Sequence, residues 1–182
     1  MASPFKSMSA TSPSRDSSFI KPGRYLMRIE KFYFGKSRKN RDFAVLKMQV
    51  VAVLDPSAAA AVPEGPHRIG DKADWMLMAD NDMSAPNLKA AFMTITEVPE
   101  SEITDEAIDL FRSDAQPLRG IFVEVDSVVR PNKAGNPFTL TTFKRRVRAK
   151  EVGTMASAAA LQSLQIDLAA EEAREKAAGQ AG

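Results

Sequence analysis

Five segments of the chain alternate apolar and polar side chains, and this alternation constrains the fold more than any other feature. The segments cover residues 24–34, 42–54, 72–78, 118–129 and 138–148. Successive side chains of a strand point to opposite faces, so the alternation predicts β-strands with one buried face. In the first segment Tyr25, Met27 and Ile29 share a face, and the phase changes near Lys31, which indicates a β-bulge.

Helical patterns interrupt and follow these segments. Between the third and fourth predicted strands, a short helix begins at Pro86-Asn87 and a second one covers residues 104–111. Thr104 is a good N-cap for the second helix, and acidic residues fill its first turn. From Thr154 onward, leucines at helical spacing in an Ala-rich stretch predict one C-terminal helix.

The predicted fold class is mostly β (α+β). We expect a five-stranded barrel close to the oligonucleotide-binding (OB) fold, with a helical insertion between strands 3 and 4 and a C-terminal helix. Residues 1–18 are rich in Ser, Pro and Ala and predict a flexible N-terminal arm. Residues 19–152 then form the OB-like domain, and residues 153–182 form the C-terminal helix and tail.

Composition excludes several classes of protein. The chain of 182 residues contains no cysteine, which excludes disulfides, thiolate nucleophiles and zinc ribbons. No apolar run approaches the roughly 20 residues that span a bilayer, so we expect no membrane association. A cytoplasmic location is the expectation, because cysteine-free chains fit a reducing compartment.

The net charge of +2 hides a strong segregation of charge. Between Ser127 and Lys150 there is no acidic residue, whereas residues 97–114 carry seven acids against Arg112 alone. This distribution indicates a basic surface beside an acidic one, which the net charge does not reveal.

Basic and aromatic residues interleave on two predicted hairpins, residues 23–47 and 130–150. Cations follow a phosphate backbone while flat rings stack on unpaired bases, which is the combination that a single-stranded nucleic-acid groove requires. The candidate nucleic-acid-binding residues, with Trp75 from the third predicted strand, are Lys31, Tyr33, Phe34, Lys36, Arg38, Lys39, Arg41, Phe43, Lys47, Trp75, Lys133, Phe143, Lys144, Arg145, Arg146 and Arg148.

Not every ring in these hairpins can face a ligand. Three consecutive rings from Phe32 cannot share one face of a strand, so at least one is core and Tyr33 or Phe34 is exposed. Phe138 and Phe143 lie on opposite phases, and Phe143 is our choice for the exposed ring. Trp75 fits the core as well as it fits a stacking platform.

In four short motifs, the chain resembles bacteriophage single-stranded DNA-binding proteins of the OB-fold type. They are Gly23–Leu26, the basic turn Lys36–Phe43, His67–Gly70 with Trp75, and Lys133–Phe138. The resemblance covers residues 23–148 and implies a viral protein that coats single-stranded DNA in replication or recombination, in the host cytoplasm. RNA binding, homo-oligomers and contacts with replication or recombination proteins stay open.

Catalytic and metal sites are not indicated. His67 is the only histidine, and neither a nucleophile nor metal-binding neighbours accompany it in the sequence. We therefore expect no enzyme, no metal and no cofactor. The alternative to nucleic-acid binding is a virion structural component or protein-interaction module, which the Ser-rich arm and the Ala-rich helix favour.

Overall fold

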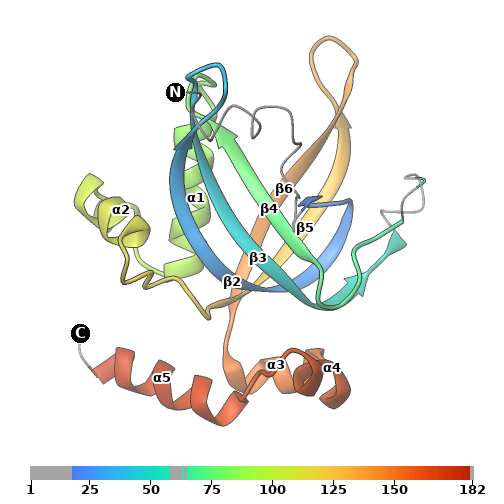
Figure 1. Ribbon diagram of the computed structural model, residues 1–182, viewed down its shortest axis with the longest axis vertical. Coiled ribbons are helices and arrows are strands. Elements are labelled where there is room, and N and C mark those ends of the chain that lie inside the picture. The colour runs from blue at the N-terminus through green and yellow to red at the C-terminus, as the bar shows by residue number, and fades with distance from the viewer. Residues whose placement is uncertain (1–17, 58–62, 64, 181–182) are drawn as a thin grey trace, which may run out of the picture.

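The computed structural model describes residues 18–57, 63 and 65–180 (Figure 1). The arm expected over residues 1–18 therefore lies, except for Ser18, outside the described part of the chain. Within the described residues, no helix is long and apolar enough to cross a membrane.

Strands from both halves of the chain build one sheet. The strands are β1 (Ser18–Phe19), β2 (Gly23–Lys36), β3 (Asp42–Asp55), β4 (Lys72–Met78), β5 (Phe122–Pro131) and β6 (Pro137–Val147). The helices are α1 (Ser84–Thr96), the 3-10 turn η2 (Glu100–Glu102), α2 (Asp105–Arg112), α3 (Ala149–Met155), α4 (Ala158–Ser163) and α5 (Leu168–Gln180). The five alternating segments of the sequence correspond to β2–β6, so the mixed α+β class with a dominant sheet is confirmed.

The strand order is β1-β4-β3-β2-β5-β6, and all neighbours pair antiparallel except the two-residue β1, which runs parallel to β4. Among the described residues no hydrogen-bonded ladder joins β6 to β4 or β1. The sheet is therefore not closed into a barrel, although a barrel was expected.

The sheet nevertheless curls strongly. Trp75 on β4 and Phe143 on β6 belong to strands far apart in the order, yet their ring centroids lie 4.8 Å apart. Their contact is part of a core that fills the inner face, with Tyr25 and Met27 fully buried. The helical insertion stands beside the sheet in Figure 1, and Phe92 of α1 is buried in the same core. As expected, Thr104 caps α2, and its hydroxyl accepts from the Ala107 N–H at 3.3 Å.

The bulge expected near Lys31 is confirmed, because the pairing of β2 with β3 shifts between Ile29 and Lys31. An extra residue on one strand exchanges the two faces beyond it. Consequently Phe32 points inward and is fully buried.

The outer face of the sheet is divided between two environments. At one end Leu26, Val51 and Phe122 pack against the C-terminal helices in a second apolar cluster. α3, α4 and α5 lie together below the sheet in Figure 1, and the expectation of a single C-terminal helix is wrong. Ser157 starts α4 by accepting the Ala160 N–H, and a left-handed Gln165 (φ +54°) follows its end, so the Ala-rich stretch breaks. The other end of the outer face carries the charged residues.

Candidate nucleic-acid interface

Three rows of side chains cross the outer face of β2, β3 and β4. Because strand partners lie opposite one another, register alone gives the rows, which are Lys31–Lys47–Asp74, Tyr33–Val45–Met76 and Gly35–Phe43–Met78. Neighbouring strands are about 4.8 Å apart and successive rows about 7 Å apart. The outer face therefore places two lysines beside two aromatic rings on one rigid scaffold.

Glycine and lysine neighbours position the two rings. The Phe43 ring lies across Gly35, where an added Cβ would come within 2.6 Å of the ring's Cζ. Tyr33 is half-buried, and the Lys31 ammonium lies 5.9 Å from the centre of its ring. Phe43 is half-buried on the face opposite Ala44 and Leu46.

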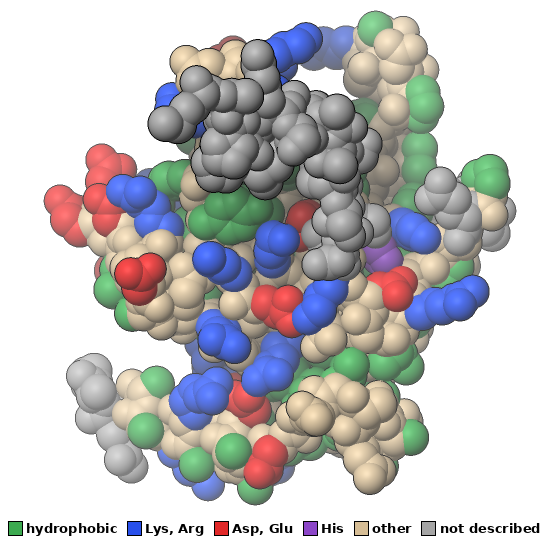
Figure 2. All heavy atoms as spheres, in the orientation of Figure 1, with side chains coloured by type: hydrophobic (Ala, Val, Ile, Leu, Met, Phe, Trp, Pro, Cys, Tyr) green, Lys and Arg blue, Asp and Glu red, His purple; other side chains and the backbone are tan. Residues whose placement is uncertain are grey.

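The loop from β2 to β3 adds further cations at the end of these rows. Its shape is fixed locally: Ser37 Oγ accepts the Arg41 N–H at 3.1 Å, and Asn40 adopts a left-handed conformation (φ +57°). Arg38 and Lys39 are exposed at the tip. We call Lys31, Tyr33, Phe43 and Lys47, with the loop cations Arg38 and Lys39, the outer basic face. Figure 2 shows Lys and Arg side chains gathered over β2, β3 and β4 and continuing toward α5.

Ion pairing divides the predicted basic residues into two groups. In the loop region, Lys36 pairs with Asp42 at 2.9 Å and Arg41 with Asp80 at 2.6 Å. The Arg41 guanidinium, as a hydrogen-bond donor, holds the pKa of the Asp80 carboxyl below its usual value. Within the described residues, the predicted cations that form no ion pair are Lys31, Arg38, Lys39, Lys47, Lys133 and Arg146.

Lys31 and Lys47 are direct cross-strand partners. Like charges placed opposite one another destabilise a sheet, and neither ammonium has a carboxylate within ion-pair distance in the described residues. A phosphate between the two side chains would relieve that repulsion. Lys72 lies on the same face but pairs with Glu30. Lys72 is not among the predicted residues, although its alternation with Asp74 along residues 72–78 indicates the same face.

The second basic segment differs from the expectation. Its sequence is free of acids, but acids approach it in space from β5, α3 and the end of α1. The pairs are Lys144 with Asp126 at 3.6 Å, Arg145 with Glu124 at 3.1 Å and Glu151 at 2.6 Å, and Arg148 with Glu97. The inference that an acid-free run leaves its charges uncompensated is therefore wrong for these three residues.

Arg146 and Lys133 occupy different positions on this hairpin. Arg146 is half-buried, its Nε atom has no hydrogen-bond partner, and burial followed by the neighbouring Arg148 lowers the pKa of its guanidinium. Lys133 is exposed at the tip, where Asn132 Oδ1 accepts the N–H groups of Ala134 and Asn136, each at 2.9 Å. β6 is separated from β3 by two strands, so the structure does not place the second segment on the outer basic face.

The choice of Phe143 as an exposed ring is wrong. Phe143 is 8% exposed and packs against Trp75, whereas Phe138 is 43% exposed. The physical reason is a register shift between Glu124 and Val125, which changes which side of β6 faces the core. Trp75 is half-buried against the core, so it is a packing residue before it is a platform.

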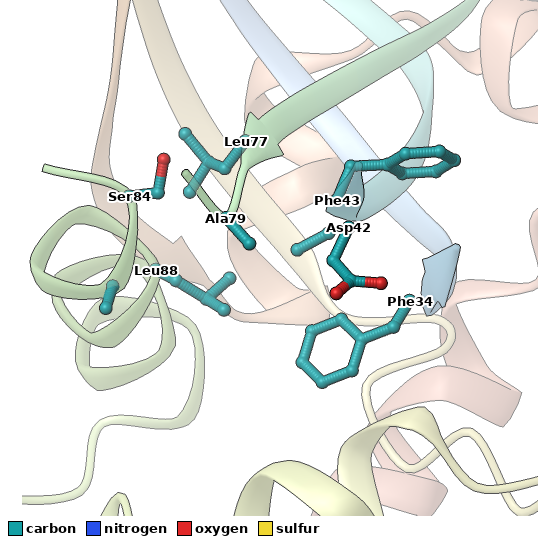
Figure 3. Close-up of a pocket in the computed structure, with 9 residues that line it drawn as sticks. Phe34, Asp42, Phe43, Leu77, Ala79, Ser84 and Leu88 are labelled. Atoms are coloured by element: carbon teal, nitrogen blue, oxygen red, sulfur yellow. The ribbon is translucent and has the colours of Figure 1, made fainter. Parts of the chain in front are cut away.

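Phe34 lines an apolar cavity of about 380 Å³ beside the outer basic face. The cavity lies between the β2–β3 hairpin, the end of β4 and the start of α1. In Figure 3, Phe34 and Leu88 point into it while the Phe43 ring extends away. Phe34 is 44% exposed, as expected for one ring of the triplet, and its ring lies 5.4 Å from the Arg112 guanidinium carbon.

His67 is buried rather than placed for chemistry. Its Nε2 accepts the Lys21 N–H at 3.0 Å, and its Nδ1 lies 3.4 Å from Asp71 Oδ2. Burial lowers the pKa of the imidazole. Among the residues that the structure describes, no group of three or more His, Cys, Asp and Glu side chains is arranged to hold a metal ion.

Comparison with known proteins adds no family to this picture. No model of a known protein family matches the chain, and no curated protein sequence matches it.

Proposed function

We propose that this protein binds single-stranded DNA without strong sequence preference, through the outer basic face. The observation that carries the proposal is that two aromatic rings share one face of the sheet with cations that form no ion pair within the described residues. Rings that stack on any base, together with cations that follow the backbone, give affinity without base recognition. No bond is made or broken in this mechanism.

The topology supports the same assignment. In OB-type barrels, which are five-stranded and partly open, oligonucleotides lie on the face of the second and third strands and on two loops. The loops join the first strand to the second and the fourth to the fifth. Here the corresponding parts are β3, β4 and the basic loop of residues 37–41, which border the outer basic face, and the turn at residues 132–136, which lies off that face.

The resemblance to phage proteins adds a biological setting to the proposal. A protein of this kind would coat exposed single strands during replication or recombination. A coating protein requires only that its binding be independent of the base sequence of the DNA. Stacking and phosphate contacts meet this requirement.

Exposed apolar side chains favour a second candidate, a protein-interaction module. Val129, Phe138 and Leu140 are each more than 40% exposed on the β5–β6 hairpin. Phe138 and Leu140 also line a groove of about 410 Å³ beside Trp75. Contiguous exposed apolar surface is typical of protein-binding sites.

Fluorescence anisotropy with a labelled oligo-dT, at low and high salt, tests the proposal. Binding should weaken steeply with salt, because each neutralised phosphate releases counterions. Duplex and RNA competitors measure the preference for single-stranded DNA. Absence of binding even at low salt would remove the nucleic-acid function and leave the interaction module as the better candidate.

A further inference from the structure

A second basic site lies where α5 meets the sheet. A pocket of about 400 Å³ is lined by three arginines that are far apart in the sequence: Arg28 from β2, Arg119 from the turn before β5, and Arg174 from α5. Gln116 completes the polar lining, but its amide is engaged with the backbone of Phe32 and Ser113. The arginines are therefore the charged groups that border the pocket.

Within the described residues, one carboxylate pairs with two of these three arginines. Glu171 accepts from Arg28 Nη2 at 2.6 Å and from Arg174 Nη1 at 2.9 Å, and it is 7% exposed. Arg119 is exposed and forms no ion pair within the described part of the chain. The pocket thus holds two positive charges in excess of its acid.

Arg28, which lines this pocket, also carries an unsatisfied donor. The Nε atom of Arg28 is buried and has no hydrogen-bond partner in the structure. A buried donor without an acceptor is costly, and the loss is greater for a charged group. The Phe122 ring lies 6.0 Å from the Arg28 guanidinium carbon, and Glu171 accepts a hydrogen bond from Arg28 Nη2. Together these contacts hold the guanidinium group in one orientation.

The backbone is also adapted to the approach of Arg174. Gly120 has φ +88°, and an added Cβ would lie 2.5 Å from Arg174 Nη1. The positive φ favours glycine at this position, and the Arg174 guanidinium lies directly against it.

We propose that this three-arginine pocket binds a phosphate group. Guanidinium groups present planar pairs of donors that match phosphate oxygens, and an excess of positive charge favours a dianion. Arg28 precedes Lys31 by three residues on the outer face of β2, a separation of about 10 Å. The pocket therefore lies beyond one end of the outer basic face. The phosphate can belong to a bound strand or be free in solution. Only its assignment to a strand rests on the proposed function.

Titration with inorganic phosphate tests the pocket without any oligonucleotide. NMR spectra that follow the arginine Nε–H signals are compared with those of a chloride titration at equal ionic strength. The Arg28 signal should shift saturably with phosphate alone. It should lose this response in Arg174→Gln and keep it in Lys176→Gln, a matched charge change on the same helix outside the pocket. No saturable shift, or an equal shift in Arg174→Gln, would overturn the proposal.

A gain of affinity provides the complementary test. Glu171→Gln removes the carboxylate that pairs with Arg28 and Arg174, so it should tighten phosphate binding roughly tenfold, as removal of a nearby like charge does. Backbone amide shifts of α5 show whether the helix keeps its place. Weaker phosphate binding with α5 in place would contradict the role of these arginines.

Oligo-dT then identifies the source of the phosphate. If the pocket holds a strand phosphate, a 12-mer should shift the Arg28 Nε–H signal, and Arg119→Gln should weaken its binding about fivefold at 0.1 M salt. A 12-mer that binds without moving this signal would show that the pocket takes free phosphate only, which refutes the extension of the strand path. Failure of the 12-mer to bind, with the phosphate response intact, would refute the proposed function and leave the pocket standing.

Discussion

Replacing Lys31 and Lys47 together by glutamine should weaken oligo-dT binding more than replacing any two cations of the predicted site that form ion pairs. The two lysines are cross-strand partners, and within the described residues neither forms an ion pair. A phosphate that binds them need not displace a carboxylate. Removing them also relieves a like-charge contact in the free protein, so the fold should not suffer.

The magnitude follows from the number of uncompensated cations. On the outer basic face, four cations form no ion pair within the described residues: Lys31, Arg38, Lys39 and Lys47. At about 0.7 per contacted phosphate, the logarithm of the binding constant should fall against log salt with a slope of roughly −2.8. The double variant should halve this slope to about −1.4. Since each contact contributes about 0.7 decade at 0.1 M salt, the affinity should drop roughly 25-fold.

Fluorescence anisotropy at several salt concentrations measures both quantities. The matched control is Lys144→Gln combined with Arg148→Gln, which also removes two charges but takes them from existing ion pairs. Exposed ion pairs contribute only about 0–1 kcal/mol to stability, so this control should stay folded. An equal or larger loss of affinity and slope in the control would refute the division into free and paired cations.

Three further predictions concern single positions. Phe43→Ala should weaken oligo-dT binding by about 1–3 kcal/mol, the value of one stacked base, without changing the dependence of affinity on salt. An unaltered affinity in fluorescence anisotropy would show that the ring does not stack on a base. Phe143→Ala should instead lower the free energy of unfolding by about 3–5 kcal/mol in urea titrations, because the ring is buried; a loss under 1 kcal/mol would contradict its place in the core. Burial lowers the pKa of His67 in the folded protein, so as the pH falls below about 6.5 the unfolded chain binds a proton at this histidine before the folded chain does. The free energy of unfolding therefore decreases as the pH falls through this range. Urea midpoints at pH 7 and 5.5 should therefore differ less in His67→Gln, and an identical difference in that variant would exclude the histidine as the cause.

Local patterns predicted most of the sheet. Alternation of side chains located β2–β6 to within a few residues, because each strand has a buried and an exposed face. The bulge near Lys31 was also visible, since a lost phase in one strand is itself a local signal. Helix α2 followed from the cap at Thr104.

What sequence could not predict depends on contacts between distant segments. Glu124 and Glu97, which pair with Arg145 and Arg148, lie 21 and 51 positions away, and no local pattern indicates them. Glu151, the other partner of Arg145, follows directly after the acid-free run. Which of Phe138 and Phe143 is buried depends on the register of β5 with β6. The three-arginine pocket joins parts of the chain separated by more than 50 residues, and its members look ordinary in their own segments.

Mapping the contact surface tests the central claim most directly. NMR chemical shifts recorded during titration with oligo-dT should change first and most at Lys31, Tyr33, Phe43 and Lys47, with saturation at a common affinity. Side chains of the β5–β6 hairpin that are engaged in ion pairs should move little. Shifts concentrated on that hairpin, with the outer face of β2 and β3 unaffected, would contradict the account.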